Sequence, residues 1–255
     1  MLDITIDLTN ITLFLLLFCR VGGTMIAAPL IGSARIPARL KAGLALTISL
    51  VLAPVAGDSA APTGAVALAL SAASEIILGL AMGFGASLIF AAVQMAGEMA
   101  DMQAAFGFAG VVSPQTGERN SVIGQLQVSV AWLIFLGANG HHVVLRGIGG
   151  SLAAVPLGRP TGFSAPALTQ AFAGLLATSI CIAAPIMAAV ILTDFSLGML
   201  TRAAPQMNLL AIGFPIKLAV GLAAALLSLP LLASDEYGLI STLDGIVRSI
   251  IAAAG

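Results

Sequence analysis

GAVALALSAASEIILGLAMGFGASLIFAAVQMA, residues 64–96, contains no charged residue other than Glu75. One upright span of the hydrocarbon core needs about 20 mostly apolar residues, and this stretch is longer than that. Because an ionisable group at membrane depth is costly, Glu75 is expected to face a partner, a bundle interior or water. Gly79 and Gly83 form a GxxxG pattern, which allows close helix contact but is weak by itself. The stretch therefore predicts a helix that packs against protein, not a straight rod surrounded by lipid.

The composition of the whole chain extends this interpretation. Of the 255 residues, 59% are hydrophobic and 8% are charged, whereas roughly a quarter of a soluble domain is charged. This number of charged residues is too small to cover a water-facing surface. Most of the exterior must therefore face lipid or other protein. The basic residues are scattered and form no stripe, which argues against a nucleic-acid partner.

Charge-poor runs divide the chain into six apolar regions, which are approximately Ile11–Ile31, Leu40–Gly57, Gly64–Ala96, Val122–Val155, Ala165–Leu192 and Leu209–Ala233. Pro185 lies within the fifth region, and Pro215 and Pro230 lie within the sixth. Each proline removes a backbone donor and tends to kink a helix. The predicted fold class is therefore all-α and membrane-associated, with kinked helical hairpins that pack together.

Basic residues also lie within some of these regions. Arg20 lies deep within the first region, as Glu75 does within the third, so a buried pairing is favoured for both, with the partners left open. Lys217 lies within the sixth region, where it is either paired or snorkels towards a membrane surface.

The C-terminal segment from Asp235 to Gly255 has a different pattern. Its apolar residues recur at helical spacing, with Asp244 and Arg248 on the other face. This pattern predicts an amphipathic helix that lies either on a membrane or against a partner; the sequence leaves both open.

Residues that could carry chemistry are few. His141 and His142 are adjacent, with no acid or thiol nearby in sequence, so a structural role at a helix end or loop is favoured over a metal site. Cys19 and Cys181 have no CxxC neighbour and are expected to be small buried side chains. No P-loop, GxSxG or HExxH motif occurs. We therefore expect no enzyme activity, no cofactor and no metal.

The stretch that follows residue 96 breaks the apolar pattern. Glu98 and Asp101 lie on one helical face, where they serve an ion path or mark a helix end that meets water. Next comes AAFGFAG, which is too short to span a membrane. Its phenylalanines, Phe106 and Phe108, either form an apolar constriction in a pore or pack in a core.

Four segments carry a resemblance to a known family: CRVGGTMIAAPLIGSARIPARLKAGLAL, GEMADMQAAFGFAGVVSPQTGE, FLGANGHHVVLRGIGGSLAAVPLG and RAAPQMNLLAIGFPIKLAVGL. In this order, and over nearly the whole chain, the sequence resembles the FliR/SctT family of type III secretion export-gate proteins. The resemblance implies one component of a helical export-gate assembly of kinked hairpins. Residues 1–160 would correspond approximately to a FliP-like part, and residues 161–255 to a FliQ-like part.

The resemblance also implies partners and a location. The expected partners are FliP-like and FliQ-like gate subunits, a FlhB-like protein, exported unfolded flagellar proteins and membrane lipid. The expected location is the bacterial inner membrane, in the flagellar basal body. The chain would help form and plug the channel that secretes unfolded flagellar subunits, without catalysing a reaction.

In the family, the loop that matches Met102–Glu118 projects into the export path and helps to plug it. Carried over by position, Phe106 and Phe108 would be the apolar stoppers. The other residues expected in this plug loop are Met102, Gln103, Gly107, Gly110 and Pro114. Polar or packing contacts within the assembly are expected at Arg20, Glu75, Glu98, Asp101, His141, Pro205, Gln206, Asn208, Gly213 and Lys217.

Three alternatives stay open. The first is an injectisome export-gate protein of the SctT type, which shares these motifs in looser form. The second is a stand-alone secondary transporter that uses Glu75, Asp101 and Asp194 as ion-coupling groups, although the two halves show no corresponding broken helices. The third is a scaffolding membrane protein without a pore.

Overall fold

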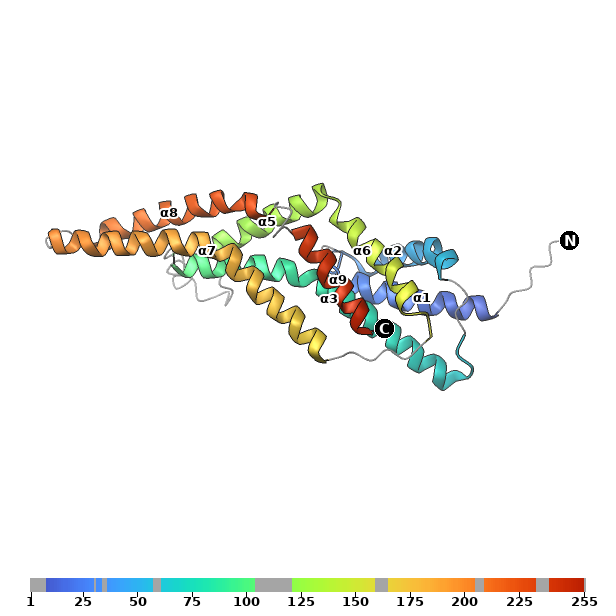
Figure 1. Ribbon diagram of the computed structural model, residues 1–255. Helices are drawn as coiled ribbons and strands as arrows, with labels where there is room; N and C mark the ends of the chain where they lie inside the picture. The colour runs from blue at the N-terminus through green and yellow to red at the C-terminus, as the bar shows by residue number, and fades with distance from the viewer. Residues whose placement is uncertain are drawn as a thin grey trace. The chain divides into compact units, whose positions relative to one another are not determined.

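The computed structural model describes residues 8–29, 31–33, 36–56, 61–103, 121–158, 165–204, 209–232 and 239–254. These residues form α-helices and one 3-10 helix, and no strand occurs among them (Figure 1). The elements are α1 Leu8–Ala27, α2 Ala38–Leu52, η1 Ala53–Val55, α3 Ala65–Gln103, α5 Val122–Gly137, α6 Gly140–Ala154, α7 Ala165–Ala203, α8 Leu209–Leu232 and α9 Leu239–Ala254. The all-α prediction is confirmed.

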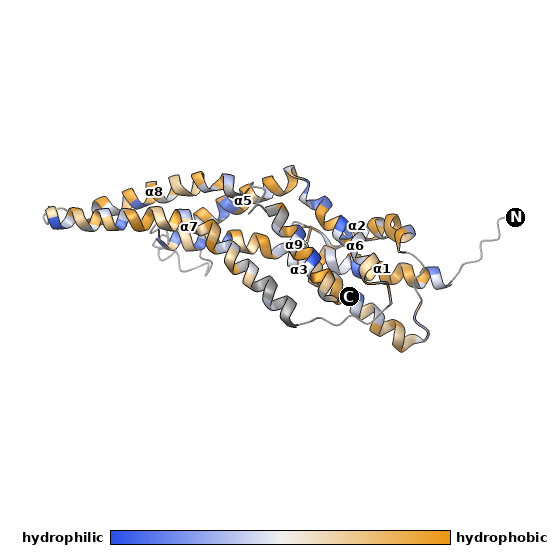
Figure 2. Cartoon of the chain, in the orientation of Figure 1, coloured by the Kyte–Doolittle hydropathy of each residue, from blue (hydrophilic) through white to orange (hydrophobic). Residues whose placement is uncertain are grey.

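Within the described parts of the chain, five helices are long and apolar enough to cross a membrane, or six if α5 and α6 count together as one broken span. Figure 2 shows the hydrophobic colour along much of α8 and of the coloured part of α7. Large apolar side chains stay exposed on the chain itself, among them Leu40, Leu50 and Leu227 at 64%, 67% and 81%. This agrees with an exterior that faces lipid or other protein.

The internal prolines do not divide the helices that contain them. Both α7 and α8 continue as helices past their internal prolines, and α7, which contains Pro185, bends part-way along its length (Figure 1). The apolar region Val122–Val155, in contrast, is divided after Gly137. There Asn139 adopts the left-handed conformation with φ 57°, which asparagine tolerates better than most residues.

The chain forms two compact units. Unit 1 contains residues 1–88, 139–172 and 243–255, and unit 2 contains residues 89–138 and 173–242. Each unit thus combines segments from both sides of residue 160. The division into a FliP-like part and a FliQ-like part stays a prediction.

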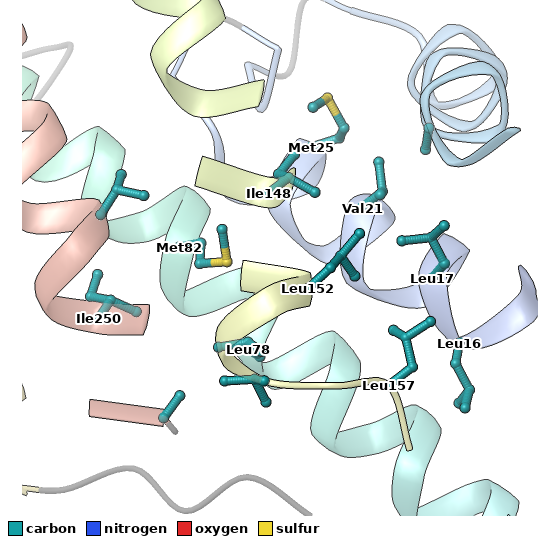
Figure 3. Close-up of a cluster of buried hydrophobic side chains, with 14 residues drawn as sticks. Leu16, Leu17, Val21, Met25, Leu78, Met82, Ile148, Leu152, Leu157 and Ile250 are labelled. Carbon is teal, nitrogen blue, oxygen red and sulfur yellow. The ribbon is translucent and has the colours of Figure 1, made fainter. Parts of the chain in front are cut away.

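Unit 1 has an apolar core built by α1, α3, α6 and α9 (Figure 3). Its members include Leu17, Leu78, Ile148 and Val247, all at most 3% exposed. The amphipathic helix α9 takes part through its apolar face, and a Cβ added at Gly85 of α3 would overlap Ile250. The C-terminal helix therefore docks on its own chain, which was neither of the two surfaces expected from its sequence.

Glycines bring α1 and α3 into backbone contact in unit 1. A Cβ at Gly79 would overlap the carbonyl oxygen of Arg20, and one at Gly83 would overlap that of Thr24. From the other side, a Cβ at Gly23 would lie 2.6 Å from the carbonyl oxygen of Ile76. Since any side chain at these positions would push the helices apart, the GxxxG pattern sets the α1–α3 crossing.

Unit 2 has a smaller apolar core, formed by Ala100, Ile123, Ile186, Val190 and Ala225. Aromatic residues extend the packing between α3 and α5, with the rings of Phe90 and Trp132 stacked at a centroid distance of 3.9 Å. The helices α7 and α8 lie side by side (Figure 1), joined by an ion pair between Asp194 and Lys217.

Cys181 is exposed on α7 and Cys19 is half-buried, so the expectation that both are buried is wrong for Cys181.

Candidate functional site

A buried ion pair links α1 and α3 in unit 1. Arg20 Nε donates to Glu75 Oε2 at 2.6 Å, and both side chains are 0% exposed. The two residues are 55 positions apart in sequence, and they meet because the glycine contact described above brings α1 against α3 one turn from Glu75. Each charge is compensated by the other within the protein and not by lipid or solvent. Such pairing is how proteins accommodate ionised groups in apolar surroundings.

The same guanidinium reaches the C-terminal end of α6. Arg20 Nη1 donates to the carbonyl oxygen of Ser151 at 3.0 Å and to its Oγ at 3.1 Å, and Nη2 donates to the carbonyl oxygen of Val155 at 2.9 Å. The last carbonyls of a helix carry a partial negative charge, and that of Ser151 also accepts from the N–H of Val155 at 2.9 Å. Arg20 therefore caps α6 while it neutralises Glu75.

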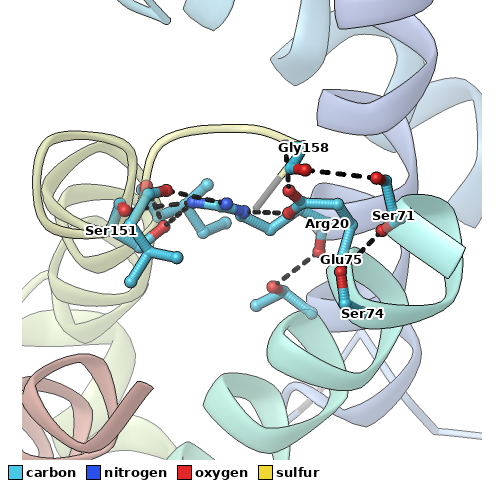
Figure 4. Close-up of polar contacts among 9 residues, drawn as sticks. Arg20, Ser71, Ser74, Glu75, Ser151 and Gly158 are labelled. Atoms are coloured by element: carbon cyan, nitrogen blue, oxygen red, sulfur yellow. Dashed lines mark hydrogen bonds and ion pairs between the residues drawn. The ribbon is translucent and has the colours of Figure 1, made fainter. Parts of the chain in front are cut away.

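Glu75 also holds the turn that follows α6. The N–H of Gly158 donates to Glu75 Oε1 at 3.1 Å, and Ser71 Oγ donates to the carbonyl oxygen of Gly158 at 3.2 Å. Gly158 has φ 82°, a conformation that favours glycine. Figure 4 shows the Arg20 guanidinium between Ser151 and Glu75, with Gly158 above the carboxylate. We call these residues, with Val155, the Arg20–Glu75 network.

A second polar arrangement lies in unit 2, where the chain leaves α3 and enters α5. The carboxylate of Asp101 is 5% exposed, and its Oδ1 accepts from the N–H of Ile123 at 3.2 Å. Ser121 is the N-cap of α5, and its Oγ accepts from the N–H of Gly124 at 2.8 Å. The two side chains thus satisfy two of the four N–H groups that a helix leaves free at its start.

Close backbone packing supports this arrangement. A Cβ at Gly97 would overlap the Cα of Gly124, so α3 and α5 cross here without intervening side chains. Asp101 lies one helical turn after Gly97 and therefore on the same face of α3. We call Gly97, Asp101, Ser121, Ile123 and Gly124 the loop base, because they hold the end of α3 against the start of α5.

The other residues predicted from the sequence lie outside both the Arg20–Glu75 network and the loop base. Met102 is 71% exposed at the end of α3, and Gln103 beside it is half-buried. Glu98 is exposed and accepts from Gln94 Nε2 at 3.0 Å. Gly213 is buried in α8. His141 stands in the first turn of α6, with its ring centroid 4.3 Å from that of His142. Residues that lie outside the described part are Phe106, Gly107, Phe108, Gly110, Pro114, Pro205, Gln206 and Asn208.

Several residues of the two arrangements were missed by sequence reasoning. Ser151 and Gly158 in the Arg20–Glu75 network, and Ser121 in the loop base, have no distinctive local pattern. Ser121 carries a partial signal, because a serine directly before an apolar run is typical of a helix N-cap.

The geometry bears on the transporter alternative. Glu75 pairs with Arg20, Asp101 accepts from α5, and Asp194 pairs with Lys217. Each of the three carboxylates therefore has a partner of its own within the chain. Among the described residues, no group of three or more histidine, cysteine, aspartate or glutamate side chains is placed to hold a metal ion.

Long apolar helices, buried charges satisfied by protein groups and an apolar exterior define an α-helical membrane protein with several membrane-spanning segments. Within this class, the sequence model of the family "Bacterial export proteins, family 1" matches residues 11–242. The chain belongs to this family.

Individual relatives agree with the family assignment. The chain is similar to the flagellar biosynthetic protein FliR of Escherichia coli (strain K12), at 30% identity over 98% of this chain and 98% of the relative. It is similar to FliR of Bacillus subtilis (strain 168) at 31% identity, over 81% of this chain and 82% of the relative. A Yersinia pestis protein, Yop proteins translocation protein T, is 28% identical over 71% of each chain.

Proposed function

We propose that this chain is a component of the flagellar type III protein export gate and that the segment Met102–Glu118 helps to close the path for unfolded flagellar subunits. The family match over residues 11–242 supports the export role. The similarity to FliR proteins extends over 81% and 98% of the chain, against 71% for the Yersinia protein. This difference favours the flagellar system over the injectisome.

The loop base is the observation that carries the plug role. A segment that blocks a path must be anchored at both ends, or else its blocking residues would drift out of the path. Asp101 and Ser121 provide such an anchor, since both engage the first turn of α5. The segment between them contains Phe106 and Phe108, whose apolar rings suit a constriction that excludes water.

The apolar exterior supports a role inside an assembly in the inner membrane. Exposed leucine, isoleucine and phenylalanine side chains occur on α2, α7 and α8, far more than a water-facing surface carries. In the proposed gate, FliP-like, FliQ-like and FlhB-like subunits and lipid cover them. The energy for export comes from other components, and this chain supplies part of the path.

The experiment replaces both phenylalanines, Phe106→Ala with Phe108→Ala, in a gate co-expressed with its FliP-like and FliQ-like subunits. We expect the membrane to leak small ions and solutes while the amount of assembled complex stays unchanged. The matched control is Phe195→Ala on α7, which removes a phenylalanine that is 68% exposed and distant in sequence. A tight membrane around a correctly assembled double variant would refute the plug role.

A further inference from the structure

One exposed side of the α3–α5 pair in unit 2 is polar, whereas large apolar side chains are exposed on α2, α7 and α8. Gln94 and Glu98 belong to α3, and Gln125 and Ser129 belong to α5. Glu98, Gln125 and Ser129 are exposed, and Gln94 is half-buried. We call these four residues the polar patch.

The two helices that carry the polar patch run antiparallel. Gly97 of α3 contacts Gly124 of α5, whereas Phe90, earlier on α3, stacks on Trp132, later on α5. Each residue turns an α-helix by about 100°. In an antiparallel pair these turns have opposite senses when seen from one end. A residue that directly follows a contact position therefore turns to the same side of the pair on either helix.

The polar patch is one surface because its residues share this side. Glu98 and Gln125 directly follow the two contacting glycines. Gln94 Nε2 donates to Glu98 Oε1 at 3.0 Å and lies 3.2 Å from the position of a Cβ at Gly124, so this amide bridges the two helices. Ser129 lies one turn after Gln125, and its Oγ donates to the Gln125 carbonyl oxygen at 2.7 Å.

Hydrocarbon is an unfavourable environment for the polar patch. A carboxylate or amide exposed to lipid loses its water without receiving a substitute. Glu98 accepts from one neutral amide, and within the described ranges no basic side chain forms an ion pair with it. Asp194 in the same unit, in contrast, has Lys217 as its partner. The polar patch therefore faces water or a polar partner.

The chemistry of the polar patch suits a partner without a fixed sequence. The amides of Gln94 and Gln125 and the hydroxyl of Ser129 all donate and accept hydrogen bonds. Every extended polypeptide presents N–H and C=O groups that match them. A specific protein interface instead has an apolar core enriched in aromatic residues, which these four residues do not supply. A path must also bind weakly enough to release what enters it, as exchangeable contacts beside water allow.

We propose that the polar patch faces the hydrated export path and contacts the backbone of the unfolded polypeptide that passes through it. This assignment rests on the export role proposed above and is independent of the plug role. Glu98 is then a hydrated carboxylate on the wall of the path, one helical turn from the bridging amide of Gln94.

Disulfide cross-linking tests the contact with the polypeptide. Glu98→Cys and Gln125→Cys are introduced separately into a chain that carries Cys19→Ala and Cys181→Ala, in the gate co-expressed with its FliP-like and FliQ-like subunits. The exported polypeptide has one cysteine in its unfolded part and ends in a stably folded domain that stalls it. The matched control is Leu227→Cys on α8, which is 81% exposed on the chain itself.

We expect each patch cysteine to cross-link to the stalled polypeptide several-fold more than Leu227→Cys. Equal cross-linking at all three positions, or none at the patch, while the polypeptide is held in the purified complex, would overturn the proposal and leave the export role standing. Patch cysteines that cross-link to a neighbouring gate subunit in place of the polypeptide would also overturn it. If the complex holds no polypeptide, the export role fails and this assignment fails with it.

The rate of export is the second measurement. Glu98→Leu combined with Gln125→Leu keeps the side chains at a similar size and removes their polar groups. We expect export to be about 2- to 10-fold slower, the change implied by one lost hydrogen bond. The amount of assembled complex should stay unchanged, because both side chains are exposed. Glu98→Gln combined with Gln125→Asn should export like wild type, because its amides still form hydrogen bonds.

Three results of the export measurement would contradict the proposal. The first is wild-type export in the double leucine variant. The second is a smaller amount of assembled complex in that variant, since the polar patch would then be an interface with a gate subunit. The third is an equal loss of export in the amide variant, since hydrogen bonding to the polypeptide would then not be what the patch supplies.

Discussion

Replacing Arg20 by methionine is expected to lower the free energy of unfolding by about 3–5 kcal/mol, because it leaves Glu75 buried without its countercharge. Methionine fills much of the space of the arginine stem, so a cavity contributes little. What is lost is the ion pair at 2.6 Å and the cap on α6. Glu75 would keep one donor in the network, the N–H of Gly158.

The size of this loss in unfolding free energy follows from the individual contacts of Arg20. The carbonyl oxygen of Val155 would lose its Arg20 donor, at about 1–3 kcal/mol for a buried group left unsatisfied, whereas that of Ser151 would keep the N–H of Val155 as a donor. The total stays near the range given above for a broken buried pair. Glu75→Leu should be less severe, because Arg20 would still donate to three oxygens of α6 and its C-cap.

The assay is unfolding of the chain in detergent by increasing SDS, followed by far-ultraviolet circular dichroism, for both single variants and the double variant. Because Arg20 and Glu75 are in contact, their effects should not add, and we expect an interaction energy of about 2–3 kcal/mol. The matched control is Arg248→Met, which breaks an ion pair with Asp244 whose side chains are 78% and 45% exposed. That change should cost about 0.5 kcal/mol or less.

Two results would refute the reasoning. The first is an Arg20→Met variant whose stability equals that of Arg248→Met, since burial would then confer no extra cost. The second is a double variant whose loss equals the sum of the single losses, since the two charges would then be energetically independent.

Two further substitutions test the packing of unit 1. Gly79→Ala should destabilise the protein by about 1–3 kcal/mol in the same SDS titration, because its Cβ meets backbone; Gly22→Ala, which meets open space, should be neutral or stabilising, and equal effects would contradict the close α1–α3 contact. Val247→Asp should release α9 and speed trypsin cleavage after Arg248, since it places a charge in the core. Ala252→Asp on the exposed face of α9 is its control, and cleavage at equal rates would contradict the docking.

The existence of the helices could be predicted from the sequence, because it depends on local properties. A long run of apolar residues must bury its backbone polar groups in helical hydrogen bonds wherever it lies in lipid or protein. This argument located α1, α3, α7 and α8 without knowledge of their neighbours. It did not locate the division at Asn139, because a single asparagine in an apolar run is compatible with a continuous helix as well as with a left-handed break.

The amphipathic pattern of α9 shows the limit of local reasoning. Its spacing of apolar residues identifies the buried face but not what covers that face. A membrane, a partner and the chain itself would all satisfy Val247 and Ile250 equally well. Only the fold shows that glycines on α3 and α6 leave room for these side chains.

What the sequence determined by itself is the fold class, the apolar exterior and the presence of costly buried charges at Arg20 and Glu75. The tertiary structure decided their partners. Arg20 meets Glu75 across 55 positions and Asp101 meets Ile123 across 22, in both cases beside a glycine contact between helices. The physical reason is that the cost of a buried charge is a property of one residue, whereas the group that offsets it depends on how closely two distant backbones approach.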